Sequence, residues 1–266
     1  MKIRSVSVVL LALSLVEGLL LSSCVEINHL RDAQESFSRA AQAENRLKFS
    51  GRPDGLLEGA GDWAAASAGY AGALASLQRL EGDSSKKSSL EADGLWGTAL
   101  TLKALCEWRL QKYPDAVKTA QLADGTYSSQ LYPRDRALLR AIPALIMTDQ
   151  AYAVVLAMES GDAGEGALQK VRGLLTGADG AMERFKRAQG AVEKSHPLQL
   201  YLVQAQLAAY DNYREAYGRR HLGDSVPKED ALRKDAQTSL VTLRSLLAAT
   251  GDQSIAAWWK GKCLLE

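Results

Sequence analysis

The stretch ALCEWRLQKYPDAVKTAQLA, residues 104–123, decides the fold class that this chain is expected to adopt. It is rich in Ala, Leu, Gln and Lys, which are strong helix formers, and the pair Tyr113-Pro114 divides it in the middle. Proline is tolerated in the first turn of a helix but disrupts a helix interior, so one helix is expected to end before Pro114 and a second to begin there. Ala116 and Ala123 are seven residues apart and share one face of the second helix. The stretch therefore predicts two helices that pack closely.

The rest of the chain has the same helical character. No stretch alternates apolar and polar residues for long, so strands are not expected. Short polar segments, among them residues 82–87, are predicted to be linkers between the helices. The ten predicted helices are residues 28–47, 62–80, 90–110, 114–123, 133–159 with a bend or break near Pro143, 167–175, 180–194, 197–217, 228–249 and 254–264. The sequence thus predicts an all-α fold of antiparallel helical hairpins, either stacked as an α-solenoid or closed into a helical bundle.

Residues 104–123 resemble the middle of a tetratricopeptide (TPR) unit. Ala104 stands at the small position of the first helix, Tyr113 at the aromatic position near the turn, and Ala116 and Ala123 at the small positions of the second helix. Two weaker matches to the second-helix pattern follow the same small-aromatic-small order: AQESFSRA, residues 33–40, and AGYAGAL, residues 68–74. The resemblance implies helical hairpins stacked as a TPR-like α-solenoid.

The N-terminus has the layout of an export signal. Lys2 and Arg4 precede an apolar run over residues 6–21, and two small residues then precede Cys24. The run is interrupted by Glu17 and falls short of the about 20 apolar residues that a transmembrane helix needs. An uncleaved N-terminal helix packed into the core, with Cys24 as an ordinary thiol, is the alternative.

Leu21-Ser22-Ser23-Cys24 resembles the lipobox of bacterial lipoproteins. The resemblance implies that the Cys24 thiol carries diacylglycerol, that cleavage occurs just before Cys24, and that the new N-terminus is acylated as well, with chains such as palmitate. Residues 1–23 are accordingly predicted to be a lipoprotein signal peptide, and residues 24–266 a TPR-like all-helical domain. Two acyl chains anchor a protein stably to a membrane. Val25 is not the Asp associated with inner-membrane retention, which favours the outer membrane, facing the periplasm.

Charge and cysteine content narrow the possible partners. Without residues 1–23, which contain Lys2, Arg4 and Glu17, the chain has 30 basic and 30 acidic residues, so no long-range field attracts nucleic acid. Cys106 and Cys263 do not make a disulfide framework, and the sequence leaves open whether they pair. Cys106 is expected to be a small buried apolar residue.

The sequence shows no constellation of residues that would support catalysis, a metal or a cofactor. His29, His196 and His221 lack a second His or Cys at helical metal-ligand spacing. No Gly-rich phosphate loop and no Gly-x-Ser-x-Gly motif occur. We therefore expect a protein that is not an enzyme. Arg219 and Arg220 are interpreted as charges that stabilise the C-terminal end of a helix.

Aromatic residues are the candidates for a binding groove, because Tyr and Trp are enriched among residues that dominate binding energy. Tyr210, Tyr213 and Tyr217 form a stripe on one predicted helix. Packing between helices is the alternative role for all of these rings. The candidate groove residues are Trp63, Tyr70, Trp96, Trp108, Tyr210, Tyr213 and Tyr217.

Three functions are consistent with these features. The first is an envelope lipoprotein, held at the membrane through lipid on Cys24, that acts as a non-enzymatic scaffold for an envelope protein partner in outer-membrane assembly, secretion or a transport complex. The second is a lipoprotein that binds a small ligand or peptide between helical hairpins. The third is a cell-wall enzyme with a dispersed pair of carboxylates.

Overall fold

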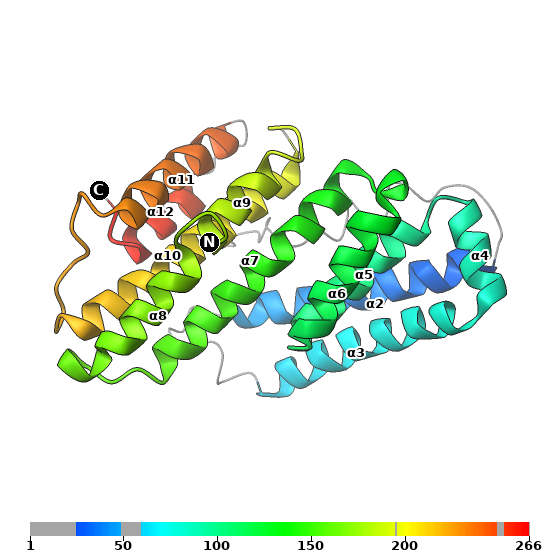
Figure 1. Cartoon of the computed structure of the whole chain (residues 1–266), viewed down its shortest axis with the longest axis horizontal. Helices are drawn as coiled ribbons and strands as arrows, with labels where there is room; N and C mark the ends of the chain where they lie inside the picture. The colour runs from blue at the N-terminus through cyan, green and yellow to red at the C-terminus, as the bar shows by residue number, and fades with distance from the viewer. Residues whose placement is uncertain (1–24, 49–59, 195, 249–252, 266) are drawn as a thin grey trace. The chain divides into compact units, whose positions relative to one another are not determined.

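The structure is a computed structural model that describes residues 25–48, 60–194, 196–248 and 253–265. Within these residues it contains eleven α-helices and two short 3₁₀ helices, and no strand (Figure 1). The all-α prediction is therefore confirmed. The described residues form two compact units, divided between Ile142 and Pro143, which are described separately below as unit 1 and unit 2.

Helices form most of each unit. The described helices of unit 1 are α2 (Val25–Lys48), α3 (Ala60–Gly82), α4 (Ser84–Ala92), α5 (Trp96–Arg109), α6 (Tyr113–Thr126) and the 3₁₀ helix η1 (Ser128–Gln130). The unit boundary falls inside α7 (Pro133–Leu156). Unit 2 continues with the 3₁₀ helix η2 (Gly161–Gly164), α8 (Glu165–Leu175), α9 (Ala181–Gln189), α10 (Pro197–Arg220), α11 (Ala231–Leu247) and α12 (Ser254–Lys262).

In unit 1, α2 and α3 lie side by side and run in opposite directions (Figure 1). The rings of Phe37 on α2 and Tyr70 on α3 have centroids 5.1 Å apart. A Cβ atom placed on Gly69 would lie 2.8 Å from the Cβ of Ala40, so the two backbones approach closely only because Gly69 has no side chain. The two weaker repeat-like segments, residues 33–40 and 68–74, thus pack against each other.

The helix pair predicted from residues 104–123 is confirmed as α5 and α6. Ala104, Ala116 and Ala123 are fully buried between helices. The turn places Gln111 at φ 58°, and its N–H donates to the carbonyl of Trp108 at 2.9 Å. This left-handed residue after the helix end is typical of the Schellman motif.

The predicted single helix over residues 90–110 is wrong, because the chain forms α4 and α5 there. The Asp83 carboxylate accepts hydrogen bonds from the backbone N–H groups of Ser85 and Lys86, which starts α4 inside the segment expected to be a linker. Gly94 then adopts φ 70°, which ends α4 in a Schellman motif. The sequence carried both signals, an N-cap residue and a glycine eleven residues later.

Pro143 does not break α7, which is helical from Pro133 to Leu156. The neighbouring Ile142 and Ala144 are fully buried, and their packing offsets the backbone hydrogen bond that proline cannot make. By length and composition α7 is the one described helix that is long and apolar enough to cross a membrane, but half of its most apolar window is buried, and core helices of soluble proteins pass the same test.

In unit 2, α10 contacts α8, α9 and α11, and α12 packs against α11. The indole N–H of Trp259 on α12 donates to Gln204 on α10 at 3.2 Å. Helix α9 ends at Gln189, before the predicted residue 194, and α11 begins only at Ala231 because the Asp230 carboxylate caps its N-terminus.

A buried carboxylate links the start of α7 to α5 in unit 1. The hydroxyl of Thr98 donates to Asp135 Oδ2 at 2.8 Å, and Asp135 is 0% exposed. Burial raises the pKa of this carboxyl, whereas the Thr98 hydroxyl and the nearby Arg134 act in the opposite direction. The charged form is therefore held at a cost to stability.

The close approach of α2 and α3 predicts opposite effects for two glycine substitutions in α3. Gly69→Ala should lower the free energy of unfolding by about 1–3 kcal/mol, because the new methyl group collides with Ala40. At Gly72 no atom lies within 4 Å of the place that a methyl group would take, so Gly72→Ala should raise the free energy of unfolding by about 0.5–1 kcal/mol. Urea unfolding of the two variants measures both effects, and destabilisation by both would contradict this packing.

The burial of Asp135 predicts a dependence of stability on pH. Because the folded-state pKa lies above that of the unfolded chain, the native protein binds the proton more tightly, and the free energy of unfolding contributed by this group rises as the pH falls. Asp135→Asn removes this contribution. The difference in free energy of unfolding between the variant and the wild type should therefore shift in favour of the wild type between about pH 7 and about pH 4.

Urea unfolding across this pH range tests the effect, with Asp93→Asn as the comparison because it removes an exposed carboxylate of the same unit. A difference between Asp135→Asn and the wild type that stays constant with pH would show that Asp135 titrates alike in the folded and unfolded chains.

Candidate functional site

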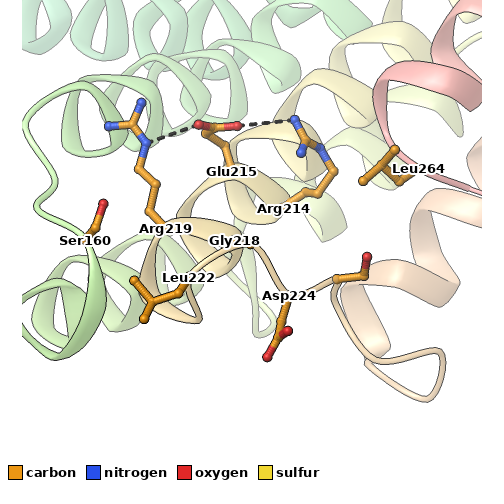
Figure 2. Close-up of a pocket in the computed structure, with 10 residues that line it drawn as sticks. Ser160, Arg214, Glu215, Gly218, Arg219, Leu222, Asp224 and Leu264 are labelled. Atoms are coloured by element: carbon orange, nitrogen blue, oxygen red, sulfur yellow. Dashed lines mark hydrogen bonds and ion pairs between the residues drawn. The ribbon is translucent and has the colours of Figure 1, made fainter.

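A pocket of about 370 Å³ opens in unit 2, at the C-terminal end of α10 (Figure 2). Its wall combines the last turns of α10 with the loop that follows them, and single residues after α7 and after α12 complete it. The lining residues are Ser160, Arg214, Glu215, Gly218, Arg219, Leu222, Gly223, Asp224, Ser225 and Leu264.

Two arginines and a glutamate form the charged side of this pocket. Figure 2 shows the Glu215 carboxylate between the two guanidiniums. Arg219 Nε donates to Glu215 Oε1 at 3.1 Å, and Arg214 Nη2 donates to Glu215 Oε2 at 3.4 Å. All three side chains are partly exposed, with fractional exposures of 23% to 40%, so these ion pairs orient the groups more than they stabilise the fold.

Further hydrogen bonds, to groups other than Glu215, hold both arginines in place. Arg219 Nη1 donates to the carbonyls of Val155 and Met158, at 2.8 and 3.5 Å, near the C-terminal end of α7. Arg214 Nε donates to Asp211 at 3.0 Å. Arg219 lies in the last turn of α10, at a helix end as the sequence predicted, but these hydrogen bonds go to carbonyls at and just after the end of α7. Within the described chain, Arg214 Nη1 and Arg219 Nη2 have no hydrogen-bond partner.

Two leucines contribute large apolar side chains to the pocket lining, and Figure 2 shows them at opposite ends of it. Leu222 and Leu264 are 79% and 53% exposed, and their φ angles are 52° and 50°. Each follows the C-cap of a helix, α10 or α12. Arg233 donates to the carbonyls of Val226 and Leu264, the latter at 3.5 Å, which ties both segments to α11.

The pocket therefore offers three kinds of contact within one small volume. It has cationic donors in fixed positions, carboxylates at Glu215 and Asp224, and exposed branched apolar side chains. Ser160 and Ser225 add hydroxyl groups that both donate and accept hydrogen bonds. This combination suits a small ligand that carries both charge signs and an apolar group.

The aromatic residues predicted for a groove lie elsewhere. In unit 1, Tyr70, Trp96 and Trp108 are buried, and Trp63 is half-buried. The Tyr70 hydroxyl donates to Glu44 at 2.7 Å, and Glu44 pairs with Arg109, whose guanidinium lies 4.5 Å from the centroid of the Trp108 ring. These rings pack between helices, which was the alternative interpretation of the aromatic pattern.

In unit 2, the predicted stripe on α10 exists. The ring centroids of Tyr210 and Tyr213 are 6.3 Å apart, and those of Tyr213 and Tyr217 are 6.2 Å apart. Tyr210 and Tyr213 are buried, and burial raises the pKa of Tyr210 to about 12. The Tyr213 hydroxyl donates to Asp230 at 3.0 Å, beside the start of α11, and Tyr217 stacks on His221 at 4.2 Å. None of the three lines the pocket.

The remaining sequence candidates have structural positions or lie outside the described residues. Cys24 lies outside them. Cys106 and Cys263 are buried free thiols, and burial raises the pKa of Cys263 to about 12. His196 caps α10, because its Nδ1 accepts from the N–H of Leu198 at 3.1 Å. Within the described ranges, no group of three His, Cys, Asp or Glu side chains is placed to hold a metal ion.

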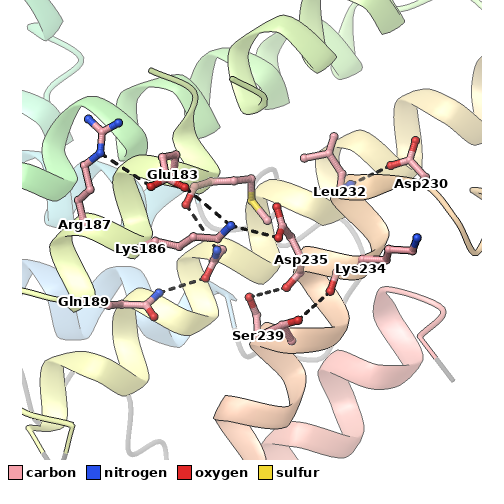
Figure 3. A network of polar contacts seen from close by, with 12 residues as sticks. Glu183, Lys186, Arg187, Gln189, Asp230, Leu232, Lys234, Asp235 and Ser239 are labelled. Atoms are coloured by element: carbon pink, nitrogen blue, oxygen red, sulfur yellow. Dashed lines mark hydrogen bonds and ion pairs between the residues drawn. The ribbon is translucent and has the colours of Figure 1, made fainter. Parts of the chain in front are cut away.

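A surface network joins α9 to α11 (Figure 3). Lys186 pairs with Asp235 at 3.1 Å and with Glu183 at 3.8 Å, and Gln189 donates to Gln206 at 3.0 Å. Lys186 and its two partners are 35% to 46% exposed. Such exposed pairs contribute little to stability and bring no reactive group together, so the network is a helix-helix contact.

Sequence reasoning predicted none of the pocket residues as site residues, and Arg219 was interpreted only as a charge at a helix end. One signal was present: Leu222 and Leu264 occupy positions after a helix end where glycine is the usual residue. Comparisons of this chain with protein-family models, with curated proteins and with solved structures gave no match, so the site rests on its own geometry.

Proposed function

We propose that this protein is an envelope lipoprotein, anchored through lipid on Cys24 in the outer membrane, whose helical body is a non-enzymatic scaffold for another envelope protein. The observation that carries the anchor is the order of a basic start, an apolar run and Leu21-Ser22-Ser23-Cys24. Assembly of outer-membrane proteins, secretion or a transport complex is the setting in which TPR-like lipoproteins act.

The paired helices support the scaffold role. In unit 1, α2 with α3 and α5 with α6 contact each other through small residues, Ala40 with Gly69 in the first pair. Such pairs are the building units of repeat proteins that bind partners across an extended surface. Two apolar side chains of this unit, Leu122 and Tyr132, are exposed at 43% and 52% and remain available for a partner.

A small-ligand function is the second candidate, because unit 2 contains the pocket at the end of α10. A cell-wall enzyme is less well supported. A glycosidase needs a carboxylic acid that donates a proton to the leaving group, whereas the Glu215 carboxylate accepts hydrogen bonds from two guanidiniums.

The anchor is tested by Cys24→Ala in the full chain expressed in a bacterium that processes lipoproteins. We expect the variant to lose labelling by radioactive palmitate and to leave the membrane fraction at high salt, because the acyl chains supply the membrane affinity. Cys263→Ala, the same change at a buried thiol, is the matched control and should remain labelled and membrane-bound. A Cys24→Ala protein that still sediments with membranes would refute the anchor.

The scaffold role is tested by a photoreactive amino acid at Leu122 on α6, in intact cells that carry the anchored protein. A partner that covers this exposed side chain should give one discrete adduct of higher mass, identified by mass spectrometry. Lys118, an exposed residue on the same helix, and Tyr132 provide further positions. The absence of an adduct from all three positions would contradict a partner bound to this part of unit 1.

A further inference from the structure

Helix α12, which packs against α11 in unit 2 (Figure 1), exposes a face that combines one tryptophan with two lysines. At about 100° per residue, the exposed residues of α12 span an arc of about 200°, with Lys260 at one edge and Lys262 at the other. Ala257, Gly261 and Trp258 lie between the two lysines, and Trp258 is 50% exposed. Helix α12 contains no acidic residue, so its own side chains give this face a positive charge.

The Trp258 ring is fixed in position although the side chain is half exposed. It meets the ring of the neighbouring Trp259 edge-on, with centroids 4.7 Å apart, and the Lys262 ammonium lies 5.0 Å from its centroid. Trp259 is buried, and its indole N–H donates to Gln204 at 3.2 Å. The indole N–H of Trp258 has no acceptor in the described part of the chain. Trp259 thus fulfils a packing role, whereas the exposed edge and the N–H of Trp258 are left for a partner outside the chain.

The two lysines keep donors for such a partner. Lys262 Nζ pairs with Asp211 Oδ2 at 3.2 Å, and the Asp211 side chain is only 15% exposed. An ammonium group has three donors, so this contact does not exhaust Lys262. Lys260 is exposed and makes no ion pair with any described residue. The face therefore presents cationic donors on both sides of Trp258.

We propose that this face of α12 lies against the surface of a membrane that contains anionic phospholipid. The Trp258 indole sits at the level of the headgroups, with its apolar ring towards the acyl chains and its N–H towards polar oxygens. Lys260 and Lys262 lie beside lipid phosphates, which are opposite in charge. The inference rests on the proposed function, because lipid on Cys24 is what brings the chain to a membrane.

A lipid surface fits this face better than a protein partner does. Tryptophans that dominate protein interfaces lie in well-packed pockets surrounded by further contacts, whereas Ala257 and Gly261, which share the face with Trp258, offer little contact area. Each lysine near an anionic surface raises the affinity only about fivefold, so the face alone binds weakly. A tether converts such a weak contact into an intramolecular one at high effective concentration.

The contact is tested on the full chain, purified from membranes in detergent and reconstituted into vesicles of phosphatidylethanolamine and phosphatidylglycerol with brominated acyl chains. Bromine quenches tryptophan fluorescence on contact, so the wild type should lose part of its emission. Trp258→Phe should abolish this loss, because Trp96, Trp108 and Trp259 are buried. Trp63→Phe, the same change at a half-buried tryptophan of unit 1, is the matched control and should keep it. Flotation in a density gradient isolates the vesicle-bound chain for the measurement.

The charge requirement is tested in the same assay. Lys260→Gln should weaken the contact about fivefold and so lower the quenching, whereas Lys170→Gln, which removes an exposed lysine of α8, should not. Vesicles of brominated phosphatidylcholine, which has no net charge, should quench less than the anionic mixture. All of these variants replace side chains that are at least partly exposed, so their urea midpoints of unfolding should equal that of the wild type.

The proposal is overturned by a vesicle-bound wild type without quenching, by equal quenching in Trp258→Phe and the wild type, or by quenching that neither Lys260→Gln nor phosphatidylcholine reduces. Mass spectrometry of the same sample reports whether Cys24 carries lipid. An acylated chain with unquenched Trp258 overturns this contact and keeps the anchor. Quenched Trp258 in a chain without lipid on Cys24 refutes the anchor and keeps the contact.

Discussion

The close approach of paired helices at small side chains is the constraint on which the fold of unit 1 depends. Ala40 and Gly69 bring α2 and α3 so near that one added methyl group would collide. Ala104, Ala116 and Ala123 are fully buried. Interiors packed at this density gain many dispersion contacts and tolerate little change in volume. The large rings then fill the space that the small residues leave beside the contact, as Phe37 and Tyr70 do.

At the ends of these closely packed helices, side chains supply hydrogen bonds to backbone groups that have no partner within the helix. Each helix has backbone N–H and carbonyl groups without intrahelical partners. In unit 2, Gln199 donates to the carbonyls of Gln189 and Val192, at 2.8 and 3.2 Å, where α9 ends. His196 and Asp230 cap the starts of α10 and α11. Several polar residues that looked isolated in the sequence thus serve to end or start helices.

The sequence was sufficient for the helical class and for the α5–α6 pair, because both depend on local composition and on the position of Pro114. It was insufficient where tertiary packing decides the outcome. The chain stays helical through Pro143 because buried neighbours stabilise it, and periodicity does not report that burial. The pocket could not be predicted from the sequence either, because Ser160, Arg214 and Leu264 come from separate segments and meet only in the fold.

A fold made of helices with short connections has few loops on which to build a binding site, so the ends of its helices are the natural place for one. At a helix end the side chains become exposed, and the last carbonyl groups accept hydrogen bonds from cationic residues. The carbonyl of Val155 accepts such a bond from Arg219. Leucine at a position that favours glycine has a cost in backbone strain, and the hydrogen bonds of the neighbouring backbone hold it there. Backbone strain alone does not distinguish these helix ends from that of α5, because Gln111 has φ 58°; Leu222 and Leu264 differ from Gln111 in exposing large apolar side chains.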